Sequence, residues 1–275
     1  MPAAESKLVR YRTEHEGRIA VLELNDPPLN GYTHEMMRAL DEGILAARFD
    51  DRVDVIVLTG AGEKHFCVGA NISMLHGATP RFKYHFCLHA NETLSRLEQT
   101  PKLVLAALNG NFVGGGLEIA LACDLRIARR QGGKDVGRTG APEVNLGVLP
   151  GTGGTQRLVR LVGKARAIEL MASGRLLDLA EAQTLGLVDR IVDAPDLAGW
   201  HAAVLDYARS FCAPGKASMA VGHIKRAAQS GAEIPLEYGL ALERELQARL
   251  FSSPDAKEGI AAYVEKRTPR FGGNA

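Results

Sequence analysis

A strand, a glycine loop and a helix follow one another closely in the middle of the chain, and this unit constrains the fold most. Residues 102–108 (KLVLAAL) form an apolar run typical of strands that are buried on both faces. Three consecutive glycines, Gly114–Gly116, lead into a helical pattern, and residues 124–128 (DLRIA) follow as another strand. Because residues 54–59 (DVIVLT) repeat the buried-strand pattern, the sequence predicts an α/β core wound from similar strand–turn–helix units.

Other segments fit the same scheme. Residues 17–25 alternate apolar and polar side chains, as a half-buried strand does, and Thr33 is placed to cap a following helix. Helical spacing returns over residues 87–98 and again over 152–162, where Thr152 is the expected N-cap. Strands and helices therefore alternate over most of the chain.

The pattern changes after residue 195, because residues 196–265 are almost entirely helical. Breaks are expected at Pro214, Pro235 and Pro254. We therefore expect two parts, an α/β core with the active site over residues 1–195 and a helical C-terminal region over 196–275. A compact core of this size does not need such an amphipathic tail, which favours self-association.

Composition excludes several classes of protein. The chain has 275 residues, 46% of them hydrophobic, and 33 basic against 32 acidic residues. A net charge of +1 argues against nucleic acid as a partner. The four cysteines are widely spaced without a CxxC pair, which argues against a disulfide framework or a zinc site. Neither an apolar N-terminal segment nor a membrane-length apolar run is present in the sequence, so we expect a cytoplasmic protein.

Glu118 lies in the first turn of the helix that follows the three glycines. Backbone N–H groups at a helix N-terminus favour a developing anion, and glycine lets a ligand approach the backbone closely. A tight turn with an ordinary glutamate near the helix dipole explains the same residues. A dinucleotide-binding fingerprint fits poorly, since Ile119 occupies the third glycine position of GxGxxG.

Two further stretches are candidates for chemistry. Residues 65–75 (HFCVGANISML) read as a strand that ends at Gly69, where the Ala70 N–H is available as a second donor. Glu143 follows a proline in the apolar, glycine-rich stretch 141–157, where burial would raise its pKa and suit a general acid. A simple turn, and a glutamate that caps a helix or pairs with an arginine, are the plainer alternatives.

Together, these three stretches resemble the crotonase (enoyl-CoA hydratase/isomerase) family over most of the chain. The motifs are Gly69-Ala70-Asn71-Ile72, Asn109-Gly110 with Gly114-Gly115-Gly116 and Glu118, Pro142-Glu143, and Leu149-Pro150-Gly151 with Gly153-Gly154-Thr155-Gln156-Arg157. The resemblance implies an α/β fold, a crotonase-type spiral of ββα turns. It also implies that the helical C-terminal region builds homotrimers or homohexamers.

The resemblance further implies a role for each matching residue. The N–H groups of Ala70 and Gly115 would form an oxyanion hole for a thioester oxygen, and Glu118 and Glu143 would be the two catalytic carboxylates of a hydratase. Contacts with the acyl-CoA are implied for Pro28, Leu29, Asn71, Ile72, Gly114 and Gly116. The expected reaction is reversible addition of water to a 2-enoyl-CoA, with Glu118 serving the water and Glu143 the Cα proton. It needs no metal, and its only coenzyme is the CoA of the substrate.

Some residues depart from the family pattern. Asn71 replaces an aspartate that is common there, and Glu143 follows Glu118 by 25 positions, a longer spacing than usual. The surplus predicts an extended, flexible basic loop over residues 129–138, solvated or in contact with a CoA phosphate or a neighbouring subunit. His85 and His89 are spaced as zinc ligands can be, but no HExxH motif accompanies them.

Three alternatives to a hydratase remain open on sequence grounds. Double-bond isomerisation, or another reaction through the same enolate, would use the same site, although the pair of glutamates favours water addition. An RNA-binding relative would need a basic face, which the net charge does not support. An oxidoreductase is disfavoured by the failed dinucleotide fingerprint. The sequence leaves the acyl group open.

Overall fold

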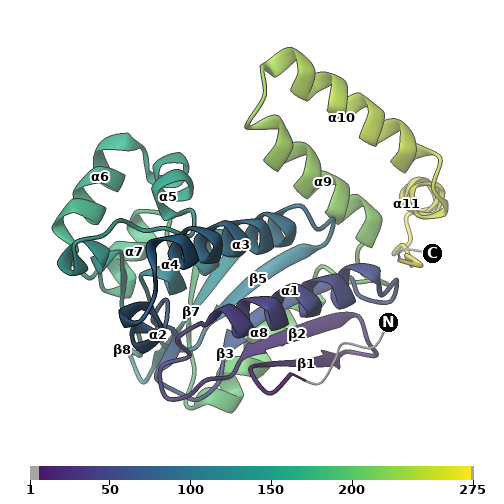
Figure 1. Cartoon of the computed structure of the whole chain (residues 1–275). Coiled ribbons are helices and arrows are strands. Elements are labelled where there is room, and N and C mark those ends of the chain that lie inside the picture. Colours follow the sequence, from purple (N-terminus) through teal and green to yellow (C-terminus); the bar gives the residue numbers. More distant parts are fainter. Residues whose placement is uncertain (1–5, 274–275) are drawn as a thin grey trace.

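Two β-sheets form the centre of the protein in a computed structural model that describes residues 6–273 (Figure 1). The larger sheet has the order β1-β2-β3-β5-β7-β10, with β8 paired to β7, and the smaller sheet has the order β4-β6-β9. The larger sheet contains β1 (Val9–Glu14), β2 (Ile19–Leu24), β3 (Val55–Gly60), β5 (Leu103–Leu108), β7 (Leu125–Gln131), β8 (Lys134–Asp135) and β10 (Arg190–Asp193). The smaller sheet contains β4 (His65–Cys67), β6 (Asn111–Val113) and β9 (Thr139–Gly140).

The chain visits the two sheets in turn, which confirms the predicted α/β spiral. Strands β3, β5 and β7 are parallel neighbours in the larger sheet, and the strands that follow them, β4, β6 and β9, are parallel neighbours in the smaller one. Helices complete the turns. They are α1 (His34–Phe49), α2 (Ile72–His76), α3 (Pro80–Glu98), α4 (Gly115–Leu121), the 3₁₀ helix η1 (Pro142–Leu146), α5 (Gly154–Val162), α6 (Lys164–Ser173) and α7 (Leu179–Thr184).

Strand β2 is buried on both faces, so the prediction of a half-buried strand was wrong. Ala20 and Leu22 pack into the core cluster beneath α1 and α3. Ile19 and Val21 point to the opposite face and pack in a second cluster with Trp200 of α8 (Leu197–Arg209). Successive side chains of β2 therefore point into two different apolar layers. The second layer forms because α8, which comes much later in the chain, covers that face of the sheet.

One helix start was predicted correctly and another wrongly. Thr33 caps α1 by accepting from the Met36 N–H, and Asp178 caps α7 in the same way by accepting from the Glu181 N–H. Helix α5 instead has Gly153 at its N-cap, in a left-handed conformation with φ of 104°. Thr152 lies one residue earlier and uses its hydroxyl elsewhere.

The predicted flexible basic loop is a β-hairpin. Strand β7 continues through Gln131, turns tightly and pairs antiparallel with β8. Arg129 is buried, with 1% of its surface exposed, and Arg130 forms an ion pair with Asp135 over 2.8 Å. The extra residues between the two glutamates therefore extend the sheet.

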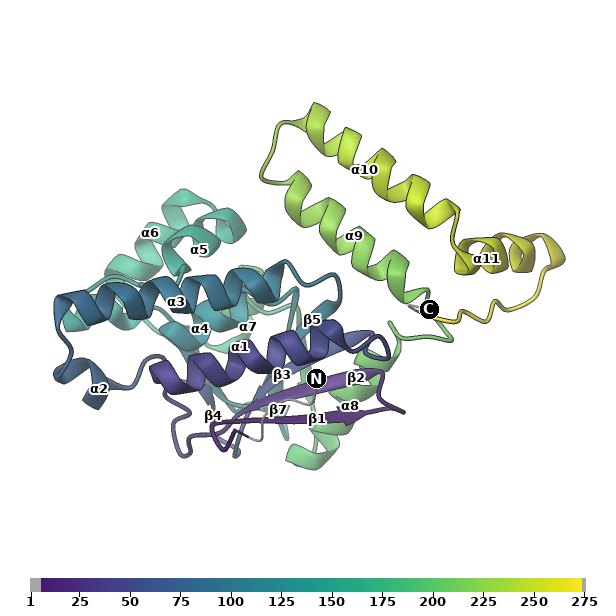
Figure 2. The same ribbon diagram turned by 45° about the vertical axis from the view of Figure 1, so that its right-hand side comes forward.

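Three C-terminal helices form an arm that projects from the core (Figures 1 and 2). They are α9 (Ser218–Gly231), α10 (Leu236–Phe251) and α11 (Pro254–Glu265). The segment after α11 returns to the base of the arm, where the Phe271 N–H donates to the Pro214 carbonyl over 3.1 Å. No helix within residues 6–273 combines the length and apolar character that a bilayer crossing requires. The predictions for residues 1–5 and 274–275 lie outside the described part.

Candidate active site

A pocket of about 320 Å³ opens where β4 and β6 end, between η1 and the loop that leads into α5. Its size is within the range of small-molecule sites. Six of the ten residues predicted for the site line this pocket, namely Ala70, Ile72, Gly114, Gly115, Glu118 and Glu143. The spiral thus brings together residues from three separate motifs.

The Ala70 N–H and the Gly115 N–H are both available as donors. The backbone of Tyr32 holds the loop around Ala70, since its N–H donates to the Gly69 carbonyl and its carbonyl accepts from Asn71, each over 2.9 Å. This pairing skips Ala70, whose N–H has no hydrogen-bond partner among residues 6–273. Gly115 begins α4, and its N–H also lacks a partner in that part of the chain. A Cβ on Gly69 would lie only 3.0 Å from the Gly115 nitrogen, so the two loops approach closely.

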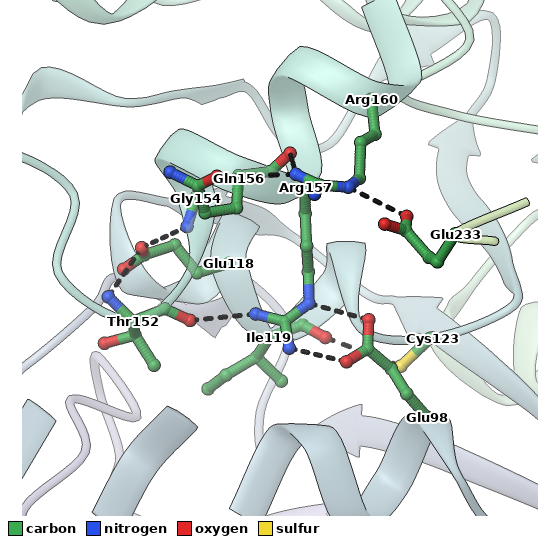
Figure 3. Close-up of polar contacts among 10 residues, drawn as sticks. All are labelled: Glu98, Glu118, Ile119, Cys123, Thr152, Gly154, Gln156, Arg157, Arg160 and Glu233. Atoms are coloured by element: carbon green, nitrogen blue, oxygen red, sulfur yellow. Dashed lines mark hydrogen bonds and ion pairs between the residues drawn. The ribbon is translucent and has the colours of Figure 1, made fainter. Parts of the chain in front are cut away.

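Glu118 is buried on α4 and held by backbone donors. Its Oε1 accepts from the N–H groups of Thr152 and Gly154, each over 2.7 Å (Figure 3). Burial has the largest effect and raises the pKa of Glu118 above its usual value, although these hydrogen bonds and the charge of Arg157 lower it in part. A raised pKa makes the carboxylate a stronger base, and the hydrogen bonds stabilise its charged form.

An ion pair fixes the loop that supplies those donors. The guanidinium of Arg157 donates to both carboxylate oxygens of Glu98, over 2.7 and 2.6 Å, and to the Thr152 carbonyl over 3.1 Å (Figure 3). A two-pronged contact of this kind restrains orientation as well as distance. Arg157, the last residue of the glycine-rich motif, therefore ties the loop at Thr152 to Glu98 of α3.

Glu143 has a strongly perturbed carboxyl group. Burial, followed by repulsion from Glu118, raises its pKa to about 7, and the charge of Lys83 lowers it slightly. Its Oε2 is buried with no hydrogen-bond partner among the described residues. A Cβ on Gly114 would lie 2.9 Å from Oε1, so glycine is needed there. A carboxyl group with a pKa near 7 exists in both protonation states at neutral pH, which suits an acid.

Four residues predicted to bind the acyl-CoA lie outside the pocket lining, and their binding role stays a prediction. Pro28 precedes Leu29, whose side chain is exposed and whose carbonyl accepts from the Val68 N–H over 3.3 Å. Asn71 caps α2 through its side chain, as an aspartate would. Gly116 packs so tightly against the Cys67 carbonyl that a Cβ would overlap it.

Sequence analysis missed several residues that line the pocket, among them Tyr32, Thr152 and Lys83. The Tyr32 hydroxyl and the Thr152 Oγ1 form a buried hydrogen bond of 2.8 Å. Tyr32 lies two residues after the Pro28-Leu29-Asn30 segment, so its proximity to predicted site residues was a signal. Thr152 was instead predicted to cap a helix. Lys83 lies on α3, with its Nζ 5.4 Å from the centre of the Phe86 ring.

The two histidines considered as zinc ligands have other neighbours. His85 packs edge-on against Tyr84, and His89 packs against His34 with ring centres 5.0 Å apart. Residues 6–273 contain no group of three or more His, Cys, Asp or Glu side chains placed to hold a metal ion.

Comparison with known proteins shows which family the chain resembles. The family described as enoyl-CoA hydratase/isomerase matches residues 14–274. A short-chain-enoyl-CoA hydratase of Clostridium acetobutylicum is 37% identical, covering 92% of this chain and 94% of its own length. A probable enoyl-CoA hydratase of Rhizobium meliloti is 38% identical over 94% and 96% of the two chains. A solved enoyl-CoA hydratase structure from Geobacillus kaustophilus superposes with a TM-score of 0.91 at 39% identity, covering 98% of both chains.

These matches span nearly the whole chain, and the site residues lie inside the matched range. The chain belongs to the enoyl-CoA hydratase/isomerase family, the crotonase family.

Proposed function

We propose that the protein is a hydratase that adds water reversibly to the double bond of a 2-enoyl-CoA. One observation supports this most, namely a buried and a half-buried carboxyl group with different environments in a pocket that also presents two N–H donors without a partner in residues 6–273. Relatives named short-chain-enoyl-CoA hydratase and crotonyl-CoA hydratase support the same reaction. The expected cytoplasmic location belongs to this proposal.

The proposed mechanism uses each of these groups. The thioester oxygen binds between the N–H groups of Ala70 and Gly115, which stabilise the enolate formed when water attacks Cβ. Glu118, as the carboxylate, accepts a proton from that water. Glu143, as the carboxylic acid, delivers a proton to Cα. The pair holds one proton before and after the reaction, so water is added without any other reactant.

The first prediction concerns hydration and its pH dependence. We expect loss of the conjugated thioester absorbance with a 2-enoyl-CoA, with a kcat/KM that falls as pH rises through about 7. The reason is that the pKa of Glu143 is about 7, so higher pH removes the proton needed at Cα. The overall reaction consumes no net proton, so dehydration must show the same alkaline limb.

A panel of 2-enoyl- and 3-enoyl-CoA thioesters separates this function from its rival. A hydratase converts the 2-enoyl thioesters to 3-hydroxyacyl products. Turnover of 3-enoyl-CoA to the 2-enoyl isomer without hydration would instead identify an isomerase. An alkaline limb far from neutrality would contradict the role given to Glu143.

The second prediction concerns assembly. We propose that the arm joins homotrimers, alone or paired as hexamers, because it exposes large apolar side chains to water, including Leu236, Tyr238, Tyr263 and Val264. Light scattering should show a trimer or hexamer at micromolar concentration. Tyr263→Lys combined with Val264→Lys should shift it toward monomer, while Lys257→Gln, an exposed change on the same helix, should not. A monomeric wild type, or unchanged assembly in the double variant, would contradict the proposal.

A further inference from the structure

We propose that Tyr32 and Thr152 act together as positioning residues for Glu118. Their two hydroxyl groups pair and hold in place the Thr152 backbone N–H, which donates to the Glu118 carboxylate. The inference rests on the hydratase function proposed above. It adds two residues that the family motifs in the sequence did not indicate, and it assigns them one shared task.

The contacts form a continuous path. The Tyr32 hydroxyl lies 2.8 Å from the Thr152 Oγ1, and both residues are buried with 2% of their surface exposed. The Thr152 N–H donates to Glu118 Oε1 over 2.7 Å. Tyr32, Thr152 and Glu118 all line the same pocket.

The paired hydroxyl groups are linked to Glu118 through the backbone of Thr152. Either hydroxyl can donate to the other, because each is both a donor and an acceptor. Burial, and then the charge of Glu118, raise the pKa of Tyr32, so the phenol keeps its proton. The pair fixes the Thr152 side chain and, with it, the N–H that donates to Glu118 Oε1.

Tyr32 also contacts the other half of the site. Its backbone pairs with Gly69 and Asn71, on either side of Ala70. Its hydroxyl and ring lie against Gly115 so closely that a Cβ there would overlap them. The ring stacks on Phe86 of α3, with centres 5.7 Å apart and planes at 21°, which fixes its orientation. One residue thus sets the relative position of both proposed oxyanion donors and the proposed base.

Tyr32→Phe and Thr152→Val each remove one hydroxyl and keep the shape of the side chain. We expect each to lower kcat for hydration about tenfold, with little change in KM. The acid limb of the kcat/KM profile should move to higher pH, because the Thr152 N–H that stabilises the charged form of Glu118 is held less firmly. The alkaline limb, set by Glu143, should stay. Thr152→Ser should keep near wild-type values, and so should Tyr84→Phe, an exposed tyrosine outside the pocket.

A double-mutant cycle tests whether the two hydroxyls act as one path. Tyr32→Phe with Thr152→Val should lose no more activity than the worse single variant. Multiplied losses, an unmoved acid limb, or a wild-type rate in Tyr32→Phe with an unchanged melting temperature would each overturn the inference.

A measurement without substrate separates this inference from the proposed function. Carbon NMR of glutamate-labelled free protein, with the Glu118 signal assigned through Glu118→Gln, follows the ionisation of Glu118 directly. A raised Glu118 pKa in both hydroxyl variants supports the path even if wild type fails to hydrate, which would refute only the function. Unchanged Glu118 titration in an active enzyme would refute only the path.

Discussion

Glu118→Gln and Glu143→Gln should each lower kcat for hydration by about 10²- to 10⁴-fold, with smaller changes in KM. Glutamine keeps the size of the side chain, and at position 118 its carbonyl can still accept from the Thr152 and Gly154 N–H groups. It cannot take the proton of water or deliver one to Cα. Because both groups act on one reaction step, the losses should not multiply fully in the double variant.

Stability distinguishes lost chemistry from lost folding in these variants. The pKa of Glu143 rises from 4.5 to about 7 on folding, so the wild type loses stability as pH rises through that interval. Glu143→Gln removes this loss and should melt at a higher temperature than wild type at pH 8. Glu92→Gln, an exposed change on α3, is the control and should match wild type in rate and melting temperature. Wild-type hydration rates in both active-site variants would refute the two-carboxylate mechanism.

Gly115→Ala should lower kcat/KM for hydration about 10²- to 10³-fold, the cost typical of one lost oxyanion donor. The new Cβ would overlap the hydroxyl and ring carbons of Tyr32. Since Tyr32 is buried and stacked on Phe86, the first turn of α4 must shift, and the Gly115 N–H moves with it. Gly115→Val would be more severe for the same reason, with a larger cost in folding.

Gly77→Ala is the matched control for this change. Gly77 ends α2 near the pocket, and a Cβ there meets no atom of the described residues within 4 Å. Its activity should equal that of wild type. Circular dichroism melting of both variants checks that they fold. A folded Gly115→Ala enzyme with near-normal kcat/KM would show that the Gly115 N–H is not a donor in the reaction.

Local signals in the sequence located the parts of the site that depend on strand ends. The glycines before α4 and the Gly69–Ala70 pair each follow a strand of the smaller sheet, and parallel neighbouring strands place their ends together. The α/β spiral followed from the repeated order of strands and helices. These features depend on patterns within about ten residues, which a single sequence displays.

The features that sequence analysis missed depend on long-range packing. Tyr32 and Thr152 are 120 positions apart, so nothing near either residue indicates their hydrogen bond. Thr152 was wrongly predicted to be the N-cap of α5, because a threonine just before a helix is the usual sequence pattern of an N-cap. Its actual partner is too far away in the sequence to be recognised. Burial of both faces of β2 likewise depends on α8, which is distant in the sequence. The hairpin depends on the pairing of β7 with β8, which a stretch rich in basic residues does not indicate.

The position of α8 along the chain has a consequence for synthesis. The pocket-lining residues all lie between positions 32 and 152, whereas the helix that covers the second face of the larger sheet spans residues 197–209. A nascent chain emerges from its N-terminus, so the site residues are made while Val21, Val57 and Ile127 still lack their cover. That uncovered apolar face is the surface through which incomplete chains would aggregate or engage a chaperone. Solubility during synthesis therefore depends on how soon α8 docks, which has no direct connection with the chemistry of the pocket.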